Sequence, residues 1–157
     1  ENVIMNKKQK SLTNKGFSLV ELIIVIAIMA VLVGVLAPQF LKYVERSRKS
    51  TDCQNATSIV TALQTYAVDP MVTTNKLTDG ATVVLTSGAT ASVDATGICT
   101  GNANLALKAA GITEVGLKSS QWGGNITLTV DIDAAGNVTV SESGASTGLS
   151  LLEGTYN

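Results

Sequence analysis

The chain has 157 residues and a formal net charge of −1, from 11 Lys and Arg against 12 Asp and Glu, which suits one modest domain. Histidine is absent and no P-loop or G-x-G-x-x-G pattern occurs, so an enzyme is not expected. Eleven of the acidic residues but only seven of the basic ones follow Phe17. This acidic balance argues against a nucleic-acid reader, which usually carries a basic stripe.

Residues 1–16 are polar and basic, with four lysines against Glu1, and Met5 is the expected start of translation. Residues 17–37 are almost wholly apolar, and no polar side chain occurs from position 22 to position 37. At ~1.5 Å per residue such a helix is ~30 Å long, which is the thickness of a bilayer core. The run is longer than the apolar core of a secretory signal, so it predicts a membrane segment. Basic residues flank it on both sides, so the distribution of positive charge does not predict the orientation of the segment in the membrane.

The helical pattern continues beyond the membrane segment. Phe40, Tyr43 and Val44 keep a spacing of three to four residues, and the spacing resumes over residues 56–67. Residues 45–52 between these stretches are polar on all sides, and we expect them to be exposed all round. Pro70 predicts the end of the helix, because the residue before a proline is pushed out of the helical region.

The sequence after Pro70 predicts short strands and a short helix. We expect strands at 81–86, 125–131 and 138–141, with a turn at 134–137 between the last two. We expect a short helix over 104–110, with Asn104 as its cap and Gly111 as its stop. The strands supply one apolar face and the long helix supplies its cover, so the predicted fold class is α+β.

Cys53 and Cys99 are an isolated pair without C-x-x-C spacing, so a zinc site is not expected. Outside the cytoplasm the two can form a disulfide, which would close a loop of about 46 residues and stabilise the fold by ~4 kcal/mol. The alternative is two buried, unpaired thiols. Asp131 and Asp133 border a turn but do not follow the EF-hand pattern, so a solvated turn is favoured over a calcium site.

The most specific feature is the run Lys15-Gly16-Phe17-Ser18-Leu19-Val20-Glu21, which leads directly into the apolar segment. A lone carboxylate in a membrane segment costs ~2.5–3.5 kcal/mol on insertion scales, unless it reaches the interface. A basic leader, Gly then Phe, Glu four residues later and an apolar helix together form the type IV prepilin pattern. Over residues 7–37 the chain closely resembles that family.

The resemblance implies a role for three residues. Gly16 matches the small residue before the bond that a membrane prepilin peptidase cuts. Phe17 matches the new N-terminal residue, which is N-methylated, and Glu21 matches the acidic residue needed for filament assembly. The physical logic is independent of the family, because a carboxylate at Glu21 can neutralise the new amine in a low-dielectric helix bundle. The amine that pairs with Glu21 can belong to the same subunit or to a neighbouring subunit.

Pro38 and Gly34 predict a weak point in the long helix. The proline ring removes one helical hydrogen bond, and the carbonyl left without a donor is that of Gly34. Pro38 matches the proline that pilins carry in this helix, where the preceding segment can melt in the filament. A simple kink at the membrane exit is the alternative.

The resemblance also implies the domain organisation. Residues 1–16 are a cleaved leader peptide and residues 17–40 a hydrophobic transmembrane and filament-core helix. Residues 41–157 form a globular pilin-like domain that includes the second half of the long helix, packed on a small antiparallel sheet, while the apolar half projects. No cofactor and no metal is implied.

The implied function is that of a structural subunit of a type IV pilus, for adhesion, motility or similar surface roles. The expected partners are other copies in a helical homopolymer, the prepilin peptidase, the pilus assembly machinery and the cytoplasmic membrane before assembly. The alternative is a pseudopilin of a type II secretion or DNA-uptake pseudopilus, since these share the N-terminal motif. A membrane-anchored binding or enzymatic domain is disfavoured, because the chain has no histidine to act as a general base.

Overall fold

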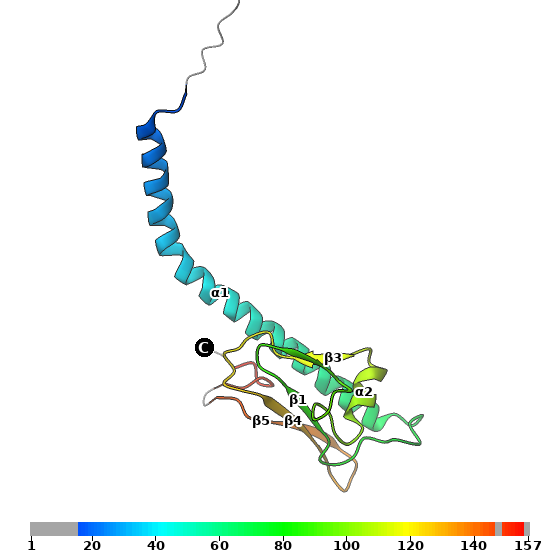
Figure 1. Cartoon of the computed structure of the whole chain (residues 1–157). Coiled ribbons are helices and arrows are strands. Elements are labelled where there is room, and N and C mark those ends of the chain that lie inside the picture. Colours follow the sequence, from blue (N-terminus) through cyan, green and yellow to red (C-terminus); the bar gives the residue numbers. More distant parts are fainter. Residues whose placement is uncertain (1–15, 147–148, 156–157) are drawn as a thin grey trace, which may run out of the picture. The chain divides into compact units, whose positions relative to one another are not determined.

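The computed structural model describes residues 16–146 and 149–155. Nearly all of the expected leader, residues 1–15, lies outside this description. The chain divides into two compact units, the first ending at Phe40 and the second beginning at Leu41 (Figure 1).

The long helix α1 comprises Leu19–Val68. Both Gly34 and Pro38 lie inside it, and the helix is continuous at both positions. A break is therefore not present in the isolated chain, and melting of this segment in a filament stays a prediction. The helix ends one residue before Asp69 and two before Pro70, as the proline predicts. The Asp69 carboxylate then accepts the backbone N–H of Met71 at 2.8 Å, which stabilises the following turn.

The second unit is built around an antiparallel sheet of three strands in the order β1-β4-β5 (Figure 1). The strands are β1 Thr82–Leu85, β4 Ile126–Ile132 and β5 Val138–Ser143, so the three expected strands are confirmed with small shifts of their ends. Alternate residues of β4 are buried from Ile126 to Val130, as expected for a strand with one covered face.

A second sheet and a short helix complete this unit. The sheet pairs β2 Thr90–Ser92 with β3 Glu114–Gly116, and neither strand was expected, because three residues are too few to show an alternating pattern. The helix α2 comprises Ala103–Ala109. Its end is a Schellman motif in which Gly111, at a φ of 79°, donates to Lys108, so the expected glycine stop is confirmed.

The expected cap of α2 by Asn104 is wrong. Asn102 precedes the helix at a φ of 65° and makes no side-chain cap hydrogen bond. Its side-chain amide instead donates to the Lys76 carbonyl at 2.9 Å, and that of Asn104 donates to Asp94 at 3.1 Å. Both asparagines connect α2 to neighbouring loops rather than closing its first turn.

The core joins α1 to the inner face of the larger sheet. From α1 the buried side chains recur at a spacing of three to four residues, and the fully buried Trp122 is the largest side chain in the cluster. The principal members are Ala56, Ile59, Leu63, Val83, Leu107, Trp122, Leu128 and Val130. A long helix on small antiparallel sheets confirms the α+β fold class.

The two cysteines pack against this core without bonding to each other. Cys53 lies in α1, and Cys99 pairs with Val83 of β1 in an isolated bridge. Both are half-buried and are free thiols in this structure, and a disulfide between them stays a prediction.

Candidate functional site

The segment before α1 presents the expected cleavage position openly. Gly16 and Phe17 precede the first helical residue, and both are exposed, Phe17 to 91%. The peptide bond between them therefore lies outside regular structure, where a peptidase can take an extended chain. The role of these two residues in processing stays a prediction.

Ser18 and Glu21 form a capping box at the start of α1. The backbone N–H of Ser18 donates to Glu21 Oε2 at 2.8 Å, and the N–H of Val20 donates to Ser18 Oγ at 3.4 Å. The pair satisfies backbone donors that the first turn of a helix leaves without partners. Glu21 was expected to be functional but Ser18 was not, although Ser-x-x-Glu before an apolar run is the signal for this motif.

The N-terminal half of α1 carries an apolar surface on all sides. Its large side chains from Leu19 to Leu36 are exposed by half or more, and none of its most apolar 18-residue stretch is buried within the chain. With a mean hydropathy of 3.1 over that stretch, α1 is long and apolar enough to cross a membrane. Water disfavours such a surface, so it needs lipid or another apolar surface as its partner.

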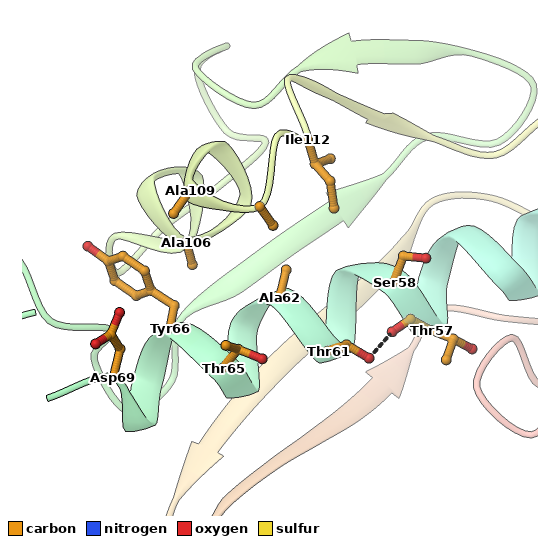
Figure 2. Close-up of a pocket in the computed structure, with 11 residues that line it drawn as sticks. Thr57, Ser58, Thr61, Ala62, Thr65, Tyr66, Asp69, Ala106, Ala109 and Ile112 are labelled. Carbon is orange, nitrogen blue, oxygen red and sulfur yellow. Dashed lines mark hydrogen bonds between the residues drawn. The ribbon is translucent and has the colours of Figure 1, made fainter. Parts of the chain in front are cut away.

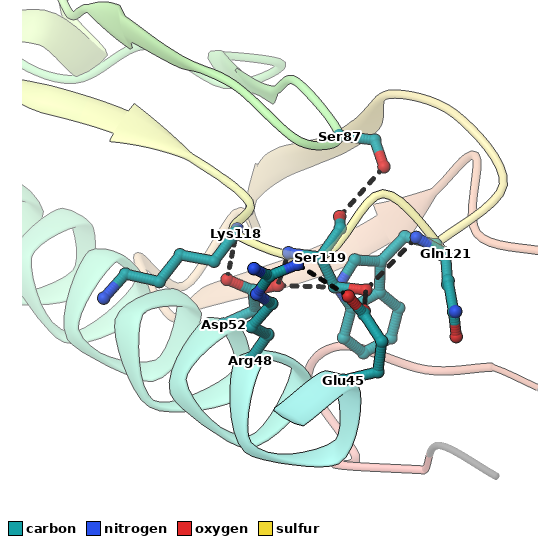
Figure 3. Close-up of polar contacts among 8 residues, drawn as sticks. Glu45, Arg48, Asp52, Ser87, Lys118, Ser119 and Gln121 are labelled. Carbon is teal, nitrogen blue, oxygen red and sulfur yellow. Dashed lines mark hydrogen bonds and ion pairs between the residues drawn. The ribbon is translucent and has the colours of Figure 1, made fainter. Parts of the chain in front are cut away.

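A buried carboxylate joins α1 to the loop before β4 (Figure 3). Asp52 is 0% exposed and accepts three hydrogen bonds. The donors are the backbone N–H groups of Lys118 at 2.6 Å and Ser119 at 3.0 Å, and Trp122 Nε1 at 2.9 Å. A carboxylate can be kept in a core only with partners of this kind, so Asp52 ties the helix to this loop.

A second layer of contacts continues outward from this joint (Figure 3). The Ser119 hydroxyl donates to Glu45 Oε2 at 2.8 Å, and Arg48 pairs with Glu45 at 2.7 Å. Lys49 is also buried, with its Nζ 6.0 Å from the centroid of the Trp122 ring.

The expectation that residues 45–52 are exposed on every side is therefore wrong. Lys49 and Asp52 are buried because loop 117–122 covers them and supplies polar partners. No periodic signal in the sequence could show this, since the partners lie about seventy positions away.

The acidic turn between β4 and β5 has a structural explanation. The Asp133 carboxylate accepts the backbone N–H groups of Ala135 and Asn137, each at 2.8 Å, and the side-chain amide of Asn137 at 2.7 Å. The hydrogen bonds from Asn137 hold the pKa of Asp133 below its ordinary value. Within the described ranges, no three His, Cys, Asp or Glu side chains come together as a metal site.

The fold and the N-terminal segment together define a class of protein, an α+β chain with an apolar N-terminal helix. The Ser18–Glu21 pair caps the first turn of that helix. Residues 12–37 match the family described as Prokaryotic N-terminal methylation motif.

Known proteins with similar sequences include a major pilin and major fimbrial proteins. The chain is 33% identical over 102 residues to the type IV major fimbrial protein FimA of Dichelobacter nodosus, covering 60% of this chain and 61% of the relative. It is 38% identical over 53 residues to the type IV major pilin protein PilA of Myxococcus xanthus (strain DK1622), covering 34% and 24%. A second FimA of Dichelobacter nodosus is 40% identical over 55 residues, covering 35% and 34%.

The matched region thus spans from about a quarter to three fifths of the relatives' lengths. No solved structure matches the chain significantly. In its methylation motif and in these relatives the chain is similar to type IV pilins.

Proposed function

We propose that the chain is a structural subunit of a type IV pilus, made as a membrane-anchored precursor and assembled into a surface filament after cleavage between Gly16 and Phe17. The observation that carries the proposal is the exposed apolar surface of α1 directly after the Ser18–Glu21 capping box. Packing the apolar helices of many copies together would cover this surface once the subunit leaves the membrane.

The capping box supports a pairing of charges after cleavage. Cleavage would create a positive amine on Phe17, and Glu21 already lies 2.8 Å from the backbone nitrogen of the next residue. We propose that a carboxylate held there would neutralise the amine of its own chain. Paired charges cost less than single ones in apolar surroundings, so the pair would let the helix end enter a filament core.

The proposal includes three partners besides other copies of the chain. A prepilin peptidase would cut after Gly16 and methylate Phe17, the pilus assembly machinery would extract the subunit, and the cytoplasmic membrane would hold the precursor. The match of residues 12–37 to an N-terminal methylation motif supports the first of these. The length and composition of α1 support the third.

The same architecture would serve a pseudopilin of a secretion or DNA-uptake machine. The names of the relatives, a major pilin and major fimbrial proteins, favour the pilus subunit. They also support a structural rather than an enzymatic role. Electron microscopy of sheared surface material separates the two, because only a major pilin gives abundant long fibres of this subunit.

One experiment tests the proposal directly. The full-length chain is expressed with a prepilin peptidase and a pilus machinery, and mass spectrometry is used to read the mature N-terminus. We expect an N-terminus at Phe17 with one methyl increment, and long filaments containing the subunit. The variant Glu21→Ala should be cleaved normally but yield few filaments. An uncleaved chain, or normal filament yield from that variant, would overturn the proposal.

A further inference from the structure

A groove lies on the second unit between α1 and α2, and it has a volume of about 520 Å³ (Figure 2). We call it the α1–α2 groove. Its apolar lining is made mainly of alanines, among them Ala62, Ala106 and Ala109, together with Ile112. Tyr66 and Asp69 lie next to each other at one end.

Three hydroxyl groups that line the groove donate their protons to backbone carbonyls of α1. Thr57 donates to the Cys53 carbonyl at 2.9 Å, and Ser58 donates to the Gln54 carbonyl at 3.1 Å. Thr61 does the same to the carbonyl of Thr57 at 2.9 Å. A hydroxyl used in this way can only accept a hydrogen bond from a group bound in the groove.

The end of the groove is acidic. One oxygen of Asp69 accepts the Met71 N–H, and within the described ranges no donor reaches the other. Tyr66 donates its hydroxyl to the Asn75 carbonyl at 3.2 Å, and its ring stands beside the carboxylate. No Lys or Arg is among the lining residues. The groove therefore suits a basic side chain with an apolar stem, because acceptors, a carboxylate and an aromatic face all favour a cation.

The chain carries a matching basic face. Lys42 and Arg46 are four residues apart on α1, both are exposed, and neither pairs with a carboxylate in the described part of the chain. Arg48 differs, since it is bound to Glu45. Like charges four residues apart on a helix repel each other, so this pair gains from an acidic partner supplied from outside.

That partner cannot be the groove of the same chain. Arg46 and Asp69 lie on one helix of the second unit, 23 positions apart, which is roughly 35 Å along its axis. The two complementary patches can therefore meet only between copies. A contact between two different patches is heterologous, and it repeats from copy to copy as an open helical assembly when it does not close into a ring.

We propose that the α1–α2 groove receives the Lys42–Arg46 face of a second copy, with Arg46 directed at Asp69. The inference rests on the proposed function in that the repeated contact would lie within the filament. It is separate from the Glu21 contact, because it involves the second unit alone.

Charge reversal in the full-length chain tests the pairing. Arg46→Asp and Asp69→Arg alone should each lower the mass of sheared filaments roughly fivefold, which corresponds to about 1 kcal/mol per contact. The double variant should recover most of the yield, because the pair is restored with opposite polarity. Lys76→Asp and Glu153→Arg are matched controls at exposed positions outside the groove, and they should assemble like the parent.

Crosslinking separates this inference from the proposed function. A chain with both Arg46→Cys and Asp69→Cys should give a disulfide ladder beyond the dimer after mild oxidation, in membranes and in sheared filaments. Either single variant, and the parent with Cys53 and Cys99, should give none above background. If the parent forms filaments, but the ladder is absent and the reversed variants assemble normally, the groove contact is wrong. If the ladder forms in membranes but no filaments form, the groove contact stands and the pilus proposal fails.

Discussion

Ser18 and Glu21 close the first turn of α1 on each other, with the Ser18 N–H 2.8 Å from the Glu21 carboxylate and the Ser18 hydroxyl 3.4 Å from the Val20 nitrogen. Glu21 can therefore act in two ways. It is a hydrogen-bond acceptor for the helix end, and it is a negative charge at the start of an apolar segment. Substitutions can separate these roles, because glutamine fills the same place in a capping box without the charge.

The first prediction concerns Glu21→Gln. The variant keeps the cap but cannot neutralise the amine of Phe17, so we expect normal cleavage and a loss of filaments nearly as complete as in Glu21→Ala. Immunoblots of whole cells and of sheared filaments measure the two quantities. Ser18→Ala is the control, since it loses about 1 kcal/mol of capping but keeps the charge. Parent-like filaments from Glu21→Gln would mean that the cap, and not the charge, is what assembly needs.

The second prediction concerns the joint at Asp52. Asp52→Ala removes the carboxylate that accepts hydrogen bonds from the buried Trp122 indole N–H and from two backbone N–H groups. We expect the free energy of unfolding to fall by about 3 kcal/mol. Trp122 is the sole tryptophan, so its fluorescence in a urea titration of the full-length chain in detergent reports on the joint. Glu153→Ala, at an exposed position, should change the midpoint little. A midpoint equal to the parent's in Asp52→Ala would show that the joint contributes nothing.

The third prediction concerns Gly144, the residue after β5. Its φ is 97°, and a Cβ there would collide with the backbone carbonyl oxygen of Asn125. Gly144→Ala should therefore destabilise the second unit by roughly 2 kcal/mol or more. Gly154→Ala is the matched control, because Gly154 also has a positive φ, of 67°, but open space around it. Thermal unfolding that is equally affected by both substitutions would refute the steric explanation.

The fourth prediction concerns the cysteines. Burial, with the Asp94 charge as a smaller cause, raises the pKa of Cys99 to about 11. Burial also raises the pKa of Cys53, to which the charges of Asp52 and Glu142 contribute. Because the thiolate is the reactive form, alkylation of the folded chain by iodoacetamide should be slow at pH 8 and accelerate up to about pH 11.

The same shift fixes a direction for stability. A folded-state pKa above the unfolded value means that the contribution of Cys99 is fully present below about pH 9 and lost as the pH rises through about 11. Cys99→Ala should remove this part of the alkaline loss of stability. Fast alkylation at pH 8 in the folded chain would contradict the prediction.

Much of the fold was predictable because it depends on local patterns. Strands β4 and β5 followed from alternating residues, the end of α1 from Pro70, and the end of α2 from Gly111. Predictions failed where the sequence pattern was very short, or where two residues fitted the same pattern equally well. The strands β2 and β3 have three residues each, and Asn102 and Asn104 both fit a cap by type.

Some residues of the candidate site were predictable from local patterns, and others were not. Glu21 was found because a carboxylate beside an apolar run is unusual in any context, and Ser18 was within reach through the capping-box spacing. The role of Asp52 was not predictable, because nothing in the nearby sequence distinguishes it from a solvated aspartate. Its burial depends on the contact of Trp122 and the surrounding loop with α1.

By itself the sequence determined the apolar helix, the position of Glu21 at its start and the α+β class, because these depend on composition and spacing over neighbouring residues. Only the tertiary structure decided that Asp52 and Lys49 are buried, that Cys53 and Cys99 are half-buried, and that a groove with acidic Asp69 at its end lies between α1 and α2. Those facts depend on contacts between positions far apart in the chain, where a side chain's surroundings are set by packing and not by its neighbours in sequence.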